Sequence, residues 1–290
     1  MRIGVTFPQT EIGNDPAVIR GYARAVEDMG FRHLLVYDRV VGADASVRPD
    51  WTGYELTDPF HEVFVLLGYL AAVTTTLELV TGVLVLPQRQ TALVAKQAAE
   101  VDVLSGGRLR LGIGVGWSPV ESEALGKAFD DRGARSEEQI ALLRALWDAD
   151  SVTFEGRWEQ VVAAGINPRP VQRPIPIWLG GYVEATLRRV GRLGDGWFPW
   201  RQPDATMRAA VERLRGYARE AGRDPAAIGL EPELNVGQGA PEEWRAFASG
   251  WQALGATHLC LSTMGNEFAT LDAHLTALER GLRALETMGD

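Results

Sequence analysis

Apolar runs and helical patterns alternate along most of the chain. Residues 2–6 are apolar and rich in β-formers, and residues 16–29 carry apolar side chains at helical spacing behind an Asp15–Pro16 start signal. Gly30 ends this predicted helix, and residues 33–38 form a second apolar run. A strand, a helix and a strand within about 35 residues make a βαβ unit, which favours a parallel sheet.

The same alternation continues to the end of the chain. Predicted helices cover 60–74 (behind Asp58–Pro59), 91–105, 135–149, 183–194, 205–222, 242–255 and 271–285, and predicted strands cover 77–86, 108–116, 175–181, 196–200, 228–236 and 258–264. The total is about eight strand–helix pairs, the number that closes a TIM barrel, and the length fits about 250 residues plus an insertion. We therefore predict a single α/β domain over residues 1–290 with a (β/α)8 TIM barrel fold. An open doubly wound sheet is the competing fold.

Two segments depart from this alternation. Residues 151–174 alternate in polarity, lack a helical period and end rich in proline, which predicts an extended insertion or hairpin after the fourth βα unit. Residues 39–58 form a long segment between the second strand and the next helix. We expect this segment to fold over the mouth of the barrel as a lid.

Composition narrows the class of protein. The net charge is −9, from 29 basic and 38 acidic residues, which argues against a generic nucleic-acid or anionic-membrane surface. The single cysteine, Cys260, excludes a disulfide framework and is expected to pack in an apolar run. Met1 leads directly into a strand, and no run approaches the roughly 18 apolar residues of a membrane span, so a cytoplasmic location is expected.

Residues 108–117, RLRLGIGVGW, carry glycines at every second position of a strand end. The run fails the G-x-G-x-x-G dinucleotide fingerprint, because the sixth position is Trp117 counted from Gly112 and Pro119 counted from Gly114. If the glycine face points into the barrel, the missing side chains leave a hollow that suits a flat ring system. The alternative is that these glycines relieve crowding against a large neighbour such as Trp178.

A second glycine site, WLGGY, places Gly180 and Gly181 between a predicted strand and the next helix. Free amides at a helix N-terminus form a good anion pocket, so this turn is a candidate for the phosphate of a cofactor. The alternative is an ordinary βα turn that needs a positive φ angle.

Several other chemistries lack their usual groups. The histidines at 33, 61, 258 and 274 show no metal-ligand spacing, so no metal is expected. The only lysines, Lys96 and Lys127, do not lie at strand ends, which removes the nucleophile of a Schiff-base aldolase, and there is no G-x-S-x-G elbow. A borrowed cofactor is then the favoured chemical agent.

Taken together, five short motifs resemble the luciferase-like monooxygenase superfamily of flavin- or deazaflavin-dependent (β/α)8 barrels. They are LPQRQ, AKQ, LSGGR, the run ending GVGW, and GDGW, and they occur in family order across roughly residues 1 to 200. The nearest resemblance is to the subgroup that uses coenzyme F-420, an 8-hydroxy-5-deazaflavin, as hydride carrier.

This resemblance implies positions for the cofactor. Its ring would lie across the barrel mouth, lined by the strand ending GVGW, with a non-proline cis peptide at Gly82–Val83 behind it and the glycine pair near its phosphate. The implied cofactor-binding residues are Gly82, Val83, Gly114, Gly116, Trp117, Gly180, Gly181, Tyr182 and Trp197. Trp51 and Trp200 are further aromatic residues expected on the active face, whereas Trp147 and Trp244 are expected in the core.

The chain departs from the pattern at one position. Several deazaflavin-using relatives carry Asp-His after the second strand, where this chain has Asp38–Arg39, and arginine cannot shuttle a proton at neutral pH. Asp38, His61, Glu121 or Tyr182 would then move the proton. Arg39 would anchor an anionic group, or it would join Asp38 in a loop salt network.

These observations predict a coenzyme F-420-dependent oxidoreductase that transfers a hydride to or from a small organic substrate. The first alternative is an FMN-dependent monooxygenase supplied by a partner flavin reductase, and the second is a non-catalytic flavin-binding protein. The longer anionic tail of the deazaflavin would distinguish the two cofactors, and Arg39, Arg89 and Arg201 are its candidate partners. A homodimer is expected by analogy with relatives.

Overall fold

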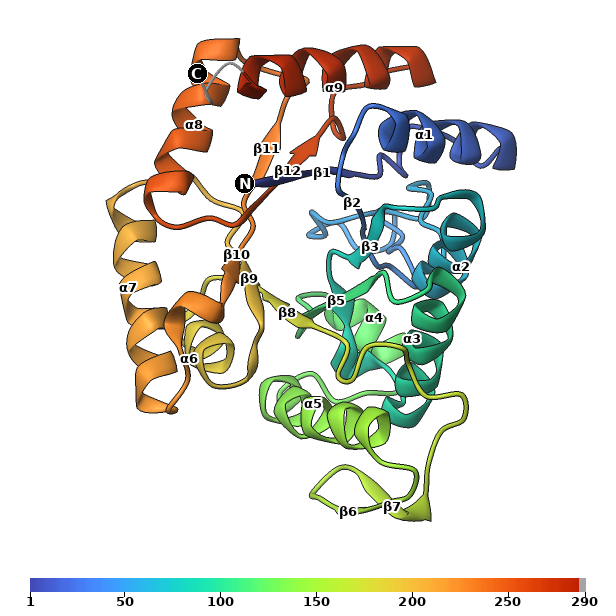
Figure 1. Cartoon of the computed structure of the whole chain (residues 1–290). Coiled ribbons are helices and arrows are strands. Elements are labelled where there is room, and N and C mark those ends of the chain that lie inside the picture. Colours follow the sequence, from blue (N-terminus) through green and yellow to red (C-terminus); the bar gives the residue numbers. More distant parts are fainter. Residues whose placement is uncertain (287–290) are drawn as a thin grey trace.

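Parallel strands form a closed ring in the computed structural model, which describes residues 1–286 (Figure 1). In chain order the ring strands are β1 (Arg2–Thr6), β2 (His33–Val36), β3 (Glu78–Thr81) with β4 (Leu84–Val85), β5 (Leu109–Gly114), β8 (Ile177–Gly180), β9 (Gly196–Phe198), β10 (Gly229–Leu230) with β11 (Glu233–Asn235), and β12 (His258–Ser262). Two of these positions each comprise two short strands, so the described chain supplies eight positions.

The ring closes through its seventh position. The hydrogen-bonded order runs from β10 through β9, β8, β5, β3, β2, β1 and β12 to β11, so the two ends of the sheet are β10 and β11. Only Glu231 and Pro232 separate these two strands along the chain. The Glu231 amide donates to the Trp197 carbonyl at 3.0 Å, and the Cys260 amide donates to the Pro232 carbonyl at 3.0 Å. The predicted (β/α)8 barrel is confirmed.

Helices surround the ring on its outside (Figure 1). They are α1 (Pro16–Asp28), α2 (Val63–Val73), α3 (Thr91–Ser105), α5 (Arg132–Asp148), α6 (Glu184–Leu193), α7 (Ala205–Glu220), α8 (Pro241–Ala253) and α9 (Leu271–Glu286), with a short α4 (Pro119–Ala124) and the 3-10 turns η1 (Leu86–Gln88) and η2 (Pro225–Ala227). Trp147, Trp244 and Cys260 are fully buried or nearly so, as predicted. Within the described residues, no helix has the length and apolar character needed to cross a membrane.

Helix boundaries differ from the prediction where a side chain caps an unexpected residue. The predicted helix at 60–74 begins at Val63, because the Glu62 carboxylate accepts the Val65 amide at 2.8 Å. The expected cap, Asp58, instead accepts the Glu55 amide at 2.7 Å within a loop. His61 therefore precedes the helix, and its expected place in the first helical turn is wrong.

The two irregular segments have different structures. The segment at 151–174 contains an antiparallel hairpin, β6 (Val152–Glu155) and β7 (Gln160–Ala164), at the periphery beside α5 (Figure 1). The segment at 39–58 holds no helix or ladder, only one bridge between Ala43 and Glu55.

Charged side chains fill the barrel interior near the starts of the strands. Glu231 forms an ion pair with Arg110 of β5 at 2.5 Å. Its other carboxylate oxygen lies 2.9 Å from His33 Nε2 of β2, within hydrogen-bond distance, and all three side chains are almost completely buried. Arg110 also reaches Glu78 of β3 at 3.1 Å and lies 4.3 Å above the ring centroid of Trp178. Burial alone would raise the pKa of Glu231, but Arg110 and His33 outweigh it and hold the pKa well below its usual range.

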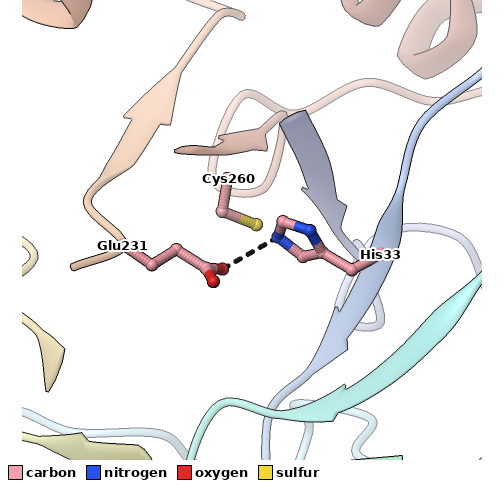
Figure 2. A group of neighbouring side chains, drawn as sticks. All are labelled: His33, Glu231 and Cys260. Atoms are coloured by element: carbon pink, nitrogen blue, oxygen red, sulfur yellow. Dashed lines mark hydrogen bonds and ion pairs between the residues drawn. The ribbon is translucent and has the colours of Figure 1, made fainter. Parts of the chain in front are cut away.

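Figure 2 shows the part of this group that has the donor types of a metal site. Ligand atoms of His33, Glu231 and Cys260 lie within 4.8 Å of one another. Arg110, however, already supplies the positive charge that Glu231 needs. Burial also raises the pKa of the Cys260 thiol well above its usual range, whereas a metal requires the thiolate. The group is therefore an ion-pair core that connects strands across the barrel.

Replacing Arg110 by Met should destabilise the protein by about 3–5 kcal/mol, because Glu231 would become a buried carboxylate without its cation. The double variant Arg110→Met, Glu231→Gln removes both charges and should recover much of that loss. Urea unfolding followed by circular dichroism measures both values. Equal destabilisation of the single and double variants would mean that packing on Trp178, and not charge, is what Arg110 contributes.

Candidate active site at the mouth of the barrel

A layer of half-buried aromatic and aliphatic side chains forms the floor of the barrel mouth. Tyr37, Val83 and Trp200 pack on an interior cluster whose members are Leu35, Val80, Trp178, Phe198 and Cys260. The three residues follow directly after, or interrupt, the ends of β2, β3 and β9. This is the end of the barrel at which enzymes of this fold place their chemistry.

Val83 occupies the space that the glycine-rich strand leaves open. The Gly82–Val83 peptide bond is cis and separates β3 from β4. A Cβ on Gly114 would lie 2.5 Å from Val83 Cγ2, and a Cβ on Gly180 would lie 3.0 Å from Val83 Cγ1. The expected open hollow is therefore corrected: the glycines of β5 and β8 receive the Val83 side chain, which presents its outer surface at the mouth.

Crowding against Trp178, the alternative reason for the glycines of β5, explains glycines of β9 and β10 instead. A Cβ on Gly196 or Gly229 would lie 2.1 Å or 2.4 Å from the Trp178 ring, so these glycines make room for the indole. Gly116 is different again, since its φ of +79° favours glycine and a Cβ there would lie 2.6 Å from Val85.

Several buried polar atoms near the strand ends have no hydrogen-bond partner among the described residues. They are Gln9 Oε1 after β1, His61 Nε2 before α2, Gln88 Nε2 after β4 and Trp200 Nε1 after β9. Trp200 also has a positive φ of 42°, an uncommon conformation for a non-glycine residue that concentrates at ligand sites. Buried polar groups are normally paired, so these atoms indicate a ligand with donors and acceptors along its edge. The ring of a flavin or deazaflavin fits that requirement.

Asp38 is held in an ion pair. Its carboxylate accepts the Arg89 guanidinium at 2.7 Å and the Val85 amide at 3.0 Å, and Arg89 also reaches Glu62 at 3.1 Å. Burial raises the pKa of Asp38, and Arg89 opposes that shift. Asp38 thus anchors the turn after β4 to the end of β2.

Arg39 and Glu121 form a second ion pair. Arg39 Nη1 lies 2.5 Å from Glu121 Oε2, and the Val40 amide donates to Glu121 Oε1 at 2.9 Å. The guanidinium also lies 4.5 Å above the ring of Trp117 and 5.2 Å from that of Tyr54. The alternative in which Arg39 joins Asp38 in a loop salt network is therefore wrong: each residue pairs with a partner on another segment.

The proposed lid contacts the end of β5 through stacked indoles. The Trp51 ring lies 5.4 Å from that of Trp117 with a 20° interplanar angle, and Trp117 remains 51% exposed. A groove of about 350 Å³ runs along the segment, lined in part by Arg39, Tyr54 and Phe60. Because Trp117 is both exposed and adjacent to this groove, it is placed to contact a ligand.

The turn before α6 is built around Gly181, whose φ is +109°. The Trp197 indole donates to the Gly181 carbonyl at 2.6 Å and is fully buried in the apolar layer that joins ring and helices. Trp197 therefore holds the turn from outside the ring, and its expected place against the cofactor is corrected. Tyr182 is 52% exposed, and Arg201 lies 4.0 Å above its ring.

The proton donors expected from the sequence do not gather at one point. Asp38 and Glu121 are committed to separate ion pairs, and Tyr182 lies at the outer turn. His61 is half-buried in the loop before α2, where burial lowers its pKa. Another carboxyl group, Glu233 of β11, lies beside the mouth floor. Its Oε2 accepts hydrogen bonds from the hydroxyls of Thr6 at 2.6 Å and Tyr37 at 2.8 Å.

Sequence reasoning missed Glu233 although a signal was present. The apolar run at 228–236 carries carboxylates at 231 and 233, two residues apart on a strand that should be buried. Alternation places both on the same face of the strand, and charged residues on the inner face of a barrel strand require a partner or a function.

Comparisons with known proteins agree with this fold. The family model described as luciferase-like monooxygenase matches residues 1–284. An uncharacterized protein of Mycobacterium tuberculosis is 39% identical over 208 residues, which cover 69% of this chain and 71% of that protein. An FMNH2-dependent dimethylsulfone monooxygenase of Pseudomonas putida is 30% identical over 231 residues, 78% of this chain and 60% of that protein. A solved F-420-dependent secondary alcohol dehydrogenase, in complex with an F-420–acetone adduct, superposes with a TM-score of 0.81 at 18% identity over 98% of both chains.

Gly114→Ala should lower the melting temperature and weaken flavin binding, because the new methyl group displaces Val83 from the mouth floor. The double variant Gly114→Ala, Val83→Ala provides the matched control, since it removes the clashing methyl groups. We expect it to recover the melting temperature, measured by thermal unfolding. A double variant as unstable as Gly114→Ala would show that Val83 is not what the glycine accommodates.

Proposed function

The chain belongs to the luciferase-like monooxygenase family, and on that premise we propose that it is a coenzyme F-420-dependent oxidoreductase that moves a hydride to or from a small organic substrate. The family comprises flavin- or deazaflavin-dependent enzymes, so the choice concerns the cofactor and the reaction. The observation that carries the choice is the state of one arginine, Arg201.

Of the three arginines considered for the anionic cofactor tail, Arg201 is the one that has no acidic partner in the part of the chain that the structure describes. Arg39 is paired with Glu121, and Arg89 with Asp38 and Glu62. Within residues 1–286, Arg201 makes no ion pair; it is exposed and lies over the Tyr182 ring. An unpaired guanidinium on an aromatic platform suits a carboxylate or phosphate.

The neighbouring helix end supports the same assignment. In the described structure the N-cap of α6, Val183, makes no side-chain capping bond, and its carbonyl accepts the amides of Thr186 and Leu187, which leaves the amides of Glu184 and Ala185 available. Gly180 and Gly181 add no side chains of their own to this turn, where Val83 packs on Gly180 and Thr186 lies beside Gly181. A phosphate placed here would meet these amides, and Arg201 would meet the anionic groups that follow the phosphate in coenzyme F-420.

The bound cofactor would supply hydride chemistry that no side chain of this chain can perform. The chain itself would position and protect the reacting ring. Val83 would support one face, Trp200 Nε1 and Gln88 Nε2 would donate to its polar edge, and the Trp51–Trp117 pair would limit access of water.

A second candidate function rests on sequence similarity. The FMNH2-dependent dimethylsulfone monooxygenase is a relative at 30% identity, and FMN shares the ring shape and a phosphate with the deazaflavin. In that case the chain would act on oxygen with reduced FMN delivered by a flavin reductase. The two candidates differ in which cofactor the apoprotein binds more tightly.

Titration of tryptophan fluorescence with coenzyme F-420 and with FMN tests this proposal, because Trp117 and Trp200 lie at the mouth. We expect tighter binding of F-420. Arg201→Gln should weaken F-420 binding about tenfold, which corresponds to about 1.4 kcal/mol, and should affect FMN less, since FMN lacks the extended anionic tail.

Arg219→Gln is the matched control, because Arg219 is exposed at the opposite end of α7 from Arg201. It should leave both affinities unchanged. Tighter binding of FMN by the native protein would select the monooxygenase instead. Equal losses for both cofactors in Arg201→Gln would place the arginine on the shared phosphate and remove the support for F-420.

A further inference from the structure

Glu233 is a carboxyl group at the barrel mouth whose hydrogen-bond partners in residues 1–286 are two hydroxyl groups and no cation. Within the described residues it forms no ion pair, although it lies two positions from Glu231 on the same face of the strand. Arg110 and His33 are both engaged with Glu231 at the lower level of the barrel. Arg110 and His33 therefore neutralise Glu231, and in the described structure neither of them forms an ion pair with Glu233, the next carboxyl group toward the mouth.

The hydrogen bonds distinguish the two oxygens of this carboxyl group. Oε2 accepts both Thr6 Oγ1 and Tyr37 Oη, whereas Oε1 accepts no hydrogen bond from the part of the chain that the structure describes. Because the lone pairs of Oε2 are occupied, the proton of the neutral acid belongs on Oε1. Glu233 is partly exposed, so its carboxyl group is accessible to a small ligand.

The surroundings of Glu233 favour this neutral form. Burial raises the pKa of Glu233, the Thr6 and Tyr37 hydroxyls oppose that shift, and the Glu231 charge adds to it. Burial also raises the pKa values of Tyr37, Tyr54 and the Cys260 thiol. Two other charged groups of the barrel interior, Arg110 and Glu78, are paired with each other, and Arg110 also pairs with Glu231.

Resting on the proposed function, we propose that Glu233 is the acid–base residue of this site and that its substrate is a small carbonyl compound or the corresponding alcohol. In reduction, Oε1–H would give its proton to the carbonyl oxygen, and the new O–H and C–H bonds would form as the C=O π bond breaks. Reduced F-420, when bound, would supply the hydride and be oxidised, so the substrate would gain the two electrons that the cofactor loses. Glu233 remains as a carboxylate that Thr6 and Tyr37 stabilise, and solvent water restores the proton.

The position of Glu233 fits this role better than that of the acids expected from the sequence. Its partner Tyr37 is one of the three residues of the mouth floor, and the Tyr37 ring lies 6.1 Å from that of Trp200. The indole N–H of Trp200 has no hydrogen-bond partner among residues 1–286. Glu233 therefore lies beside the floor on which a ring would rest, whereas Asp38 and Glu121 face cations in the surrounding loops.

The protonation state is tested on the apoprotein by infrared spectroscopy as a function of pH. Native protein should keep the carbonyl stretch of a protonated carboxylic acid to a higher pH than its exposed glutamates do, and Glu233→Gln should lack that band. Tyr37→Phe removes a donor to the carboxylate, so the band should persist to higher pH. Tyr69→Phe is the control, since the Tyr69 hydroxyl donates to Pro16 on the outside of the barrel. Identical spectra for native protein and Glu233→Gln would overturn the proposal.

The proton transfer is tested by following reduced F-420 oxidation with acetone, the smallest ketone, as probe. The rate should fall as pH rises through the pKa of Glu233, because the reaction uses the protonated form, and Tyr37→Phe should move this fall to higher pH. Glu233→Gln should lower kcat about a hundredfold or more with F-420 affinity retained, and Glu233→Asp should recover part of it.

The outcomes separate this inference from the proposed function. Failure of the native protein to bind F-420 would reject the cofactor while the infrared result still decides the state of Glu233. Binding of F-420 without acetone turnover would reject the carbonyl substrate class. Turnover with an unchanged pH profile in Glu233→Gln would reject Glu233 as the acid.

Discussion

The buried pair between Arg110 and Glu231 is the constraint on which the barrel interior depends. Glu231 lies where the seventh strand is interrupted by Pro232, which cannot donate a ladder hydrogen bond, so the ring closes there with fewer backbone bonds. The Glu231 carboxylate compensates by reaching across the ring to β5 and β2. Arg110 and His33, near the starts of the strands, are thus paired with Glu231. The Glu231 charge also contributes to the raised pKa of Glu233, the next carboxyl group toward the mouth.

Packing sets the second condition. Trp178 fills the lower interior and needs Gly196 and Gly229 beside it, while Val83 fills the level above and needs Gly114 and Gly180. The glycines therefore do not leave an empty chamber. Because these four positions carry no side chains, Trp178 and Val83 can fill the interior beside them. Val83 then forms part of the floor of the mouth. A flat ring could rest on this floor, which Val83 shares with Tyr37 and Trp200.

Local signals in the sequence were sufficient for most of the fold. The bounds of α3 agree with the prediction, and the glycine and proline punctuation placed the ring strands in order. The failures involve partners distant in the sequence. Asp38 pairs with Arg89 and Arg39 with Glu121, 51 and 82 positions away, and no local pattern specifies such pairs. Trp197 was misplaced because strand alternation turns it outward, and Glu233 was missed because only the closed ring brings Thr6 and Tyr37 to its carboxylate.

The arginine after Asp38 attaches the lid segment to the neighbouring loop. Arg39 joins the lid segment to Glu121 on α4 and stacks on Trp117, so a residue at the end of β2 has become part of the lid attachment. A permanently charged guanidinium in this position stabilises the loops but cannot exchange a proton. Proton chemistry must then come from a group that is close to the floor and able to change its charge. The proposed acid, Glu233, satisfies both conditions because it contacts Tyr37 of the floor and forms no ion pair within residues 1–286. The arginine that attaches the lid and the proposed proton donor thus belong to different parts of the barrel, the loop after β2 and strand β11.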